Sequence, residues 1–153
     1  MRNKQKGFSL IELLIVVAII LIIAAIAIPN LMRSKMAANE ASAVASLRTI
    51  NTSSVSFSTT YGAFPTALSQ LGPSSTPSST AADLVDNVLA TGTKSGYTFS
   101  FTPGSGATAG TAYSVNADPV SSSTGQRHFY TDQTLVIRAN TSTAATSGSN
   151  PIG

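Results

Sequence analysis

The dominant pattern in the sequence is an apolar run that continues from Leu13 to Ile28 without one polar side chain. With the residues just before it, this run forms the segment 8–28, which would be about 31 Å long as an α-helix. The hydrocarbon core of a bilayer is about 30 Å thick, so the segment predicts a membrane-spanning helix. Glu12 is its single charged residue, and a buried carboxylate costs about 2.5–3.5 kcal/mol at the bilayer centre. Glu12 lies near the N-terminal end, where a carboxylate reaches the interface and suits the helix dipole.

Beyond Pro29 the pattern changes from uniformly apolar to amphipathic, which predicts that helix continues over residues 29–60. Proline breaks or kinks a helix because it lacks an N–H, so Pro29 either ends the first helix or kinks one long helix. The inward stripe, apolar except at Ser54, consists of Met36, Ala43, Leu47, Ile50, Ser54, Phe57 and Tyr61. We expect the polar residues on the other faces to meet neighbouring chains or solvent; they include Asn39, Glu40, Ser42, Ser46, Arg48, Thr49 and Asn51.

Turn residues and apolar anchors follow the long helix. Gly62 and Pro65 should stop it, and Phe64, Leu68 and Leu71 can fold back against it. Residues 73–80 contain only Ser, Thr and Pro, which predicts a loop. The next stretch predicts a short helix over 81–89 capped by Thr80, with an inward side made of Leu84, Val85, Val88 and Leu89.

Strand patterns fill the remainder. Residues 97–101 and 113–117 alternate between core-type and polar side chains, as half-buried strands do. Residues 127–138 predict a hairpin that turns near Asp132 and Gln133. We therefore predict an α+β fold in which the long helix packs on a small antiparallel sheet of three or four strands. Residues 140–153 are rich in Ser, Thr, Ala and Gly and predict a flexible tail.

The charge of the chain is unevenly distributed. The net charge of +3 comes from Arg2, Lys4 and Lys6, because six Lys/Arg balance six Asp/Glu from Phe8 onward. The remainder therefore gives no basis for a basic nucleic-acid surface, and no pattern selects a nucleic acid as partner. With no cysteine, the chain has no disulfide framework, thiolate chemistry or Cys-based metal site.

Three interpretations of the N-terminal segment compete. A secretory signal peptide would explain the basic start and the triplet 25–27, but its apolar region should be about 7–15 residues long. A plain membrane anchor explains the length and the flanking charges and leaves Glu12 unexplained. The third interpretation comes from resemblance.

The stretch Gly7-Phe8-Ser9-Leu10-Ile11-Glu12, with the apolar run behind it and Pro29, resembles the N-terminus of type IV pilin precursors and of the related pseudopilins of type II secretion. The resemblance implies that a prepilin peptidase cuts between Gly7 and Phe8 and methylates the new amine of Phe8. It also implies that Glu12 of one subunit pairs with that amine on a neighbour, and that one long helix kinks at Pro29. The implied division is a cleaved leader at 1–7, a transmembrane and filament-core helix at 8–28, its amphipathic half at 29–60, a head at 61–139 and a tail at 140–153.

The resemblance implies partners and a location as well. The partners are further copies of the chain in a helical filament, the peptidase, an inner-membrane assembly platform with its ATPase, and membrane lipid before assembly. The precursor would cross the inner membrane once and then become part of an extracellular pilus. A structural subunit of a type IV pilus is thus the first hypothesis, a type II secretion pseudopilin the second, and a single-pass membrane-anchored binding module the third.

Enzymatic and ligand-binding chemistry finds little support in the head. His128 is the single histidine, so we expect a strand residue with an ordinary partner rather than a metal or catalytic group. The Gly-rich stretch 104–110 joins two predicted strands and opens no helix, which argues against a phosphate-binding loop. In the loop 118–125 only Asp118 is anionic, too few carboxylates for a typical calcium site. We therefore assign no catalytic residue, cofactor or metal.

Overall fold

The computed structural model describes residues 7–152, and the basic leader residues 1–6 lie outside this range. The chain divides into two units, 1–35 and 36–153, which we describe separately. The helices are α1 (Leu10–Tyr61) and α2 (Asn87–Ala90), with short 3-10 turns at Leu68–Leu71 and Gly106–Thr108. The strands are β1 (Thr93–Lys94), β2 (Tyr97–Pro103), β3 (Tyr113–Pro119), β4 (His128–Asp132), β5 (Arg138–Asn140) and β6 (Asn150–Pro151).

The first unit contains the apolar half of α1. The helix begins at Leu10, two residues later than expected, and continues through Pro29 without interruption, so Pro29 does not end it. Between Phe8 and Ile28 the large apolar side chains are all 46–81% exposed. This half of the helix thus has no folding partner within its own unit.

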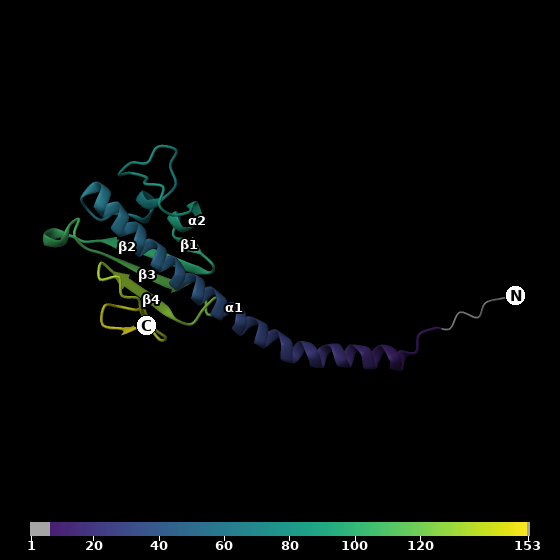
Figure 1. Ribbon diagram of the computed structural model, residues 1–153. Coiled ribbons are helices and arrows are strands. Elements are labelled where there is room, and N and C mark those ends of the chain that lie inside the picture. The colour runs from purple at the N-terminus through teal and green to yellow at the C-terminus, as the bar shows by residue number, and fades with distance from the viewer. Residues whose placement is uncertain (1–6, 153) are drawn as a thin grey trace. The chain divides into compact units, whose positions relative to one another are not determined.

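The second unit, which we call the head, is built on an antiparallel meander. In the described part of the chain the strands lie in the order β1 to β6, each antiparallel to the next. The head portion of α1 lies across one face of the sheet (Figure 1). The helix ends where expected, because Gly62 adopts a φ of +81°, a left-handed conformation that glycine reaches without a Cβ clash.

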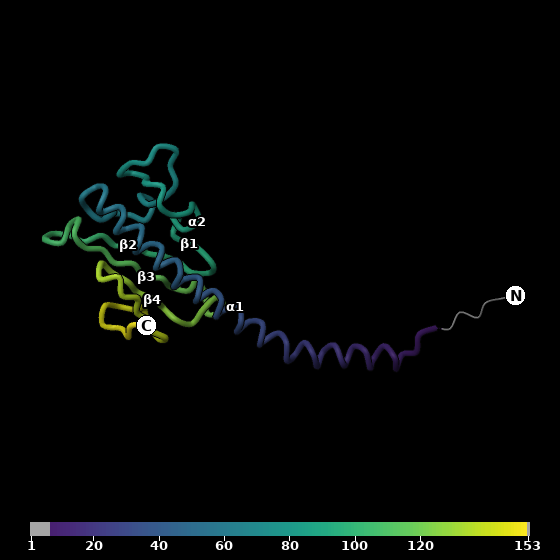
Figure 2. The backbone as a smooth tube through the Cα atoms, in the orientation of Figure 1, coloured from purple at the N-terminus to yellow at the C-terminus, as the bar shows by residue number. Residues whose placement is uncertain are grey.

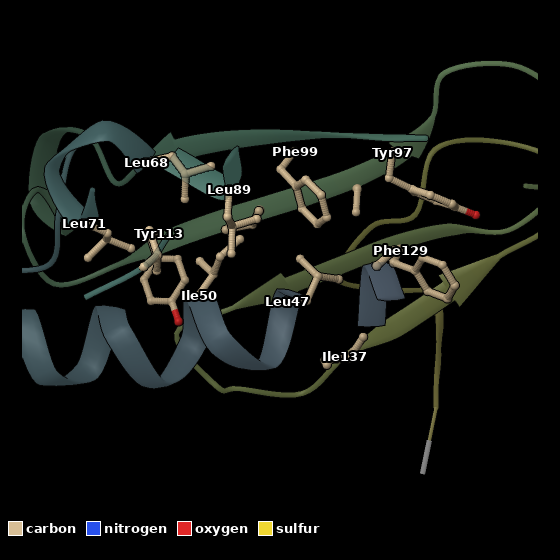
Figure 3. Close-up of a cluster of buried hydrophobic side chains, with 14 of the residues drawn as sticks. Leu47, Ile50, Leu68, Leu71, Leu89, Tyr97, Phe99, Tyr113, Phe129 and Ile137 are labelled. Carbon is tan, nitrogen blue, oxygen red and sulfur yellow. The ribbon is translucent and has the colours of Figure 1, made fainter. Parts of the chain in front are cut away.

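The core lies between α1 and the sheet. Its helix side is the predicted stripe, of which Ala43, Leu47, Ile50, Ser54 and Phe57 are buried. Figure 3 shows Leu47 and Ile50 among the aromatic and aliphatic side chains of the strands and connections, which include Leu68, Leu71, Leu89, Tyr97, Phe99, Tyr113, Phe129 and Ile137. The predictions of the amphipathic stripe and of the folded-back leucines are confirmed.

Three polar residues expected on the outer faces of α1 are instead buried, namely Glu40, Ser46 and Asn51. Glu40 accepts hydrogen bonds from the backbone N–H groups of Gln126 and Arg127, and its Oε2 lies 2.7 Å from Nε of Arg127. Asn51 donates to Oγ1 of Thr131 at 2.8 Å and accepts from the hydroxyl of Tyr113 at 3.0 Å. These side chains replace water around buried polar groups of the head, so burial costs them little.

The electrostatics of Glu40 follow from these contacts. Burial raises the pKa of its carboxyl, but the N–H donors of Gln126 and Arg127 and the Arg127 guanidinium outweigh burial and hold the pKa below its usual value. Tyr97 lies at the same end of the head and donates to the carbonyl of Arg127 at 2.8 Å. Its pKa rises to about 12, mainly through burial. Glu40 is therefore ionised at neutral pH and fastens the segment before β4 to α1.

The prediction of a short helix over residues 81–89 is largely wrong. Helix α2 covers only Asn87–Ala90, and its cap is Asp86, whose carboxylate accepts from the N–H of Leu89 at 2.9 Å. The preceding residues form an irregular segment because their N–H groups bond to carbonyls of the segment 70–72 instead. Val88, expected to face inward, is 55% exposed.

The C-terminal sheet also differs from expectation. The described sheet has six strands rather than three or four, since two-residue strands lie at both edges. The 127–138 hairpin exists, but a five-residue connection, 133–137, joins its strands. The turn widens because Asp132 accepts from the N–H of Thr134, Leu135 adopts a φ of +66°, and Ile137 enters the core.

The expected tail, 140–153, is not a free extension over its described residues. Figure 2 shows this segment, in yellow, turning back toward the sheet. Strand β6 pairs with β5, Ala145 is buried, and Asn116 of β3 donates to its carbonyl at 2.8 Å. The residue pattern showed little sign of this packing, because most of the segment is small and polar and its one large apolar residue, Ile152, packs on the core at the end of a backbone pairing.

Candidate processing and assembly site

The predicted processing point lies in irregular chain just before α1. Gly7, Phe8 and Ser9 are outside the helix, and Phe8 is 81% exposed. Among the described residues, apart from its chain neighbours, no atom lies within 4 Å of the position that a Cβ on Gly7 would occupy. A peptidase needs an accessible scissile segment outside a helix, and the bond between Gly7 and Phe8 has both properties.

Glu12 occupies the first turn of α1 and closes its N-terminus. Its Oε2 accepts a hydrogen bond from the backbone N–H of Ser9 at 2.8 Å, and Leu13 donates to the carbonyl of Ser9 at 3.2 Å. This is the carboxylate half of a capping box, in which a residue three positions into the helix satisfies a free N–H at its start. The carboxylate also lies at the positive end of the helix dipole.

This cap explains why the helix begins at Leu10. This helix cap was not predicted from the sequence, because the free-energy cost of placing Glu12 in the bilayer was considered without the hydrogen bonds at the helix start. The spacing Ser9-x-x-Glu12 is a sequence signature of the cap. Only Oε2 is engaged, so Oε1 of Glu12 has no hydrogen-bond partner among residues 7–152. One carboxylate can therefore cap its own helix and still accept a second partner.

The apolar surface beside Glu12 is continuous. From Leu10 to Ile28 every described side chain is exposed except that of Ala24, which is half-buried. In the described chain α1 is the one helix long and apolar enough to cross a membrane, judged by length and composition. Such an area far exceeds the few hundred Å² of contiguous apolar surface that soluble monomers expose.

The head contains no comparable chemical site in its described part. His128 Nδ1 lies 2.6 Å from Oδ1 of Asp118, so the prediction that His128 is a strand residue with an ordinary partner is confirmed. That contact also occupies the one carboxylate of the loop 118–125. Among residues 7–152 no three His, Cys, Asp or Glu side chains come together as metal ligands would. The stretch 104–110 joins β2 to β3, as expected.

Comparison with known proteins gives three findings. Residues 2–28 match the family described as the prokaryotic N-terminal methylation motif. The chain is 41% identical over 92 residues to the type IV wide pilus major component PilA4 of Thermus thermophilus, which covers 56% of this chain and 66% of that protein. It is 46% identical over 54 residues to the type IV major pilin protein PilA of Myxococcus xanthus, covering 35% and 24% respectively. No solved structure matches.

The exposed apolar helix and the sheet-bearing head form an α+β fold that is consistent with the pilin fold. The motif and the two relatives together support the chain being a type IV pilin precursor. The matched regions span less than two thirds of either relative's own length.

Proposed function

We propose that the chain is a structural subunit of a type IV pilus, processed after Gly7 and polymerised through its N-terminal helix. The observation that carries this proposal is the apolar half of α1, whose large side chains between Leu10 and Ile28 are 46–79% exposed. Water is a poor solvent for such a surface, so it needs either lipid or other apolar helices. In a membrane-anchored precursor this surface contacts lipid, and after entry into a filament it contacts the helices of other subunits.

Cleavage between Gly7 and Phe8 creates an α-amine four residues before Glu12. An ammonium and a carboxylate that are both withdrawn from water stabilise each other, whereas either alone would be costly. We propose that the amine of Phe8 on one subunit pairs with Glu12 of another, through the oxygen that the helix cap leaves free. Because only one axial alignment brings the two charges together, the pair sets the register of addition.

The remaining parts follow from this role. Residues 1–7 are the leader, 8–28 the membrane and filament-core helix and 29–60 its amphipathic half, with a helix kink at Pro29. Residues 61–139, together with the packed segment 140–152, form the sheet-bearing part of the head. A prepilin peptidase processes and methylates the chain in the inner membrane. An assembly platform and its ATPase then extract it into the extracellular filament. The subunit itself performs no catalysis and uses no cofactor on this proposal.

The pseudopilin of a type II secretion system is the less favoured function. Both relatives are named for pili, and one is named a wide pilus major component. The loop 118–125, the candidate calcium region in a pseudopilin, has its one carboxylate paired with His128.

The proposal is tested by Glu12→Gln, which separates the two roles of this side chain. Glutamine can still accept from the N–H of Ser9, so the helix start is kept and only the charge is removed. We expect the variant to insert in the membrane and be cleaved, and to form no surface filaments by electron microscopy. Asp118→Asn, which removes a carboxylate from the head, is the matched control and should be piliated. Normal piliation of Glu12→Gln would overturn the proposed role of the charge.

A further inference from the structure

Most charged side chains of the head have a partner within the subunit. In its described part, two ion pairs join Glu40 with Arg127 and Asp86 with Lys94, and a hydrogen bond joins Asp118 with His128. Asp132 accepts from Thr134, and Arg138 donates to the carbonyl of Ser149. Within residues 36–152, the charged side chains that make neither an ion pair nor a hydrogen bond are Arg48 and Asp83, and both are exposed. They have opposite signs.

Arg48 belongs to one flank of the head, which we call the hairpin flank. Asn51 lies three residues further along α1, on the same side of the helix, and donates to the carbonyl of Leu135 at 3.4 Å. Val55 follows four residues after Asn51 and is 39% exposed, while Leu135 and Val136 are 47% and 36% exposed. The hairpin flank therefore combines one unpaired cation with three exposed apolar side chains: Arg48, Val55, Leu135 and Val136.

Asp83 belongs to the other flank, which we call the loop flank. Leu84 follows Asp83 in the chain, and its carbonyl accepts a hydrogen bond from the hydroxyl of Ser53 at 3.1 Å. This contact places the loop that contains Asp83 beside α1. Ser53 and Asn51 are two residues apart, so their side chains leave the helix about 200° apart. The two flanks thus lie on different sides of α1. The loop flank is the exposed surface around Asp83.

The backbone of Asp83 adds a separate observation. Its φ is +55°, a left-handed conformation that costs a residue with a side chain more than glycine. Its own N–H is satisfied by the carbonyl of Gly72, but its carboxylate contacts no donor in the described chain. Strained residues without an internal role are frequently found at contact sites.

We propose that the hairpin flank of one subunit docks on the loop flank of a second copy, with Arg48 paired to Asp83. This inference rests on the proposed function, because it assigns a head-to-head contact within the filament. The two flanks are complementary in charge, and the hairpin flank carries exposed apolar side chains beside its cation. Because they are different surfaces of one chain, the contact is heterologous and repeats in an open-ended polymer, whereas a self-complementary patch would close a dimer.

Neutral substitutions test the pair without disturbing the fold. Arg48→Gln removes the cation, and Asp83→Asn removes the anion while keeping a residue that tolerates a positive φ. Each should reduce the filament recovered after shearing by about two- to fivefold, the range of an exposed ion pair. The double variant should lose no more than either single one, because the pair is already broken. Lys94→Gln and Asp86→Asn, which alter charges paired inside the subunit, are matched controls.

Cross-linking tests the geometry directly, because the natural chain has no cysteine. Filaments of Arg48→Cys/Asp83→Cys should yield a ladder of covalently linked subunits with a short bis-maleimide cross-linker, because cysteines that replace an Arg–Asp pair lie farther apart than the Cα separation of about 4.4–6.8 Å that a disulfide needs. The control is Arg48→Cys/Thr98→Cys, since Thr98 is exposed on the outer face of β2. A ladder no stronger than that of the control would overturn the docking contact, and so would additive losses of recovered filament in the double neutral variant. Neither result would contradict filament formation itself. If the unsubstituted chain forms no filaments, the proposed function itself fails.

Discussion

The two halves of α1 have the same secondary structure and opposite relations to the rest of the chain. From Phe8 to Ile28 the large apolar side chains are exposed on all sides, and none has a folding partner in its own unit. From Ala43 to Phe57 one stripe is buried against the sheet, and polar residues beside it are bonded to loops of the head. The first half is stabilised only by an environment outside the subunit, whereas the second is stabilised from within. A helix of this kind can change its surroundings without unfolding its head.

The sharpest test of this difference removes one apolar side chain from each half. Leu47 is fully buried, so Leu47→Ala should lower the free energy of unfolding of the head by about 2–5 kcal/mol. Ile15 is 51% exposed, so Ile15→Ala should leave the unfolding of the head unchanged. Thermal unfolding of the full chain in detergent micelles, followed by near-ultraviolet circular dichroism, makes the comparison. Equal losses would show that the halves are not independent.

A smaller effect is expected at the polar boundary of the head. Glu40→Gln should cost about 1–3 kcal/mol at pH 7, because its amide oxygen can still accept from the N–H groups of Gln126 and Arg127, but its NH2 group cannot accept from Nε of Arg127. The Arg127 side chain is 43% exposed, so water replaces part of the lost contact and holds the loss within this range. Chemical denaturation with urea measures the loss.

The pH dependence of that loss follows from the lowered pKa of Glu40. A carboxylate whose pKa is lower in the folded state stabilises the fold above its unfolded value, here the ordinary 4.5. This stabilisation disappears as the pH falls through the folded pKa. The natural chain and Glu40→Gln should therefore converge in the stability of the head as the pH falls below 4.5. Glu12→Gln should change the stability of the head neither at pH 7 nor in this acid range. If the natural chain and Glu40→Gln differed in stability by the same amount at every pH in this range, the ionisation of Glu40 would be excluded as the source of the difference.

The smallest effect concerns Ser54, the one polar member of the inward stripe. Its Oγ is buried without a hydrogen-bond partner among the described residues. Removing an unsatisfied hydroxyl removes a desolvation cost, so Ser54→Ala should be neutral or up to about 1 kcal/mol more stable. Urea denaturation beside Leu47→Ala gives the measurement, and a loss above 1 kcal/mol would show that the hydroxyl has a partner.

The parts of the fold predicted from sequence are those with strong periodicity. The long helix, its inward stripe and strands β2 and β3 follow from regular spacing, because burial of one face requires it. The segment 81–89 was mispredicted, since its helical apolar spacing could not reveal that its N–H groups bond to residues 70–72. The packed segment 140–152 was missed for a similar reason, because apart from Ile152 its contacts are made by backbone and by small side chains.

Prediction of the candidate site divides in the same way. The run from Gly7 to Glu12 is a local motif, so it could be found without a structure. The burial of Glu40 and Asn51 could not, because their partners lie between 62 and 87 residues away and are brought close only by the sheet. Arg48 and Asp83 stand out only after the other charges of the head are paired.

The central claim, that this chain is processed and assembled through its N-terminal helix, is tested most directly by intact mass spectrometry of sheared surface filaments. The account predicts that the bulk component is this chain, beginning at a methylated Phe8. A chain that begins at Met1 would indicate an unprocessed anchor, and one that begins at Ile28 would indicate a secreted protein. Either result, or filaments made of another protein, would contradict the claim.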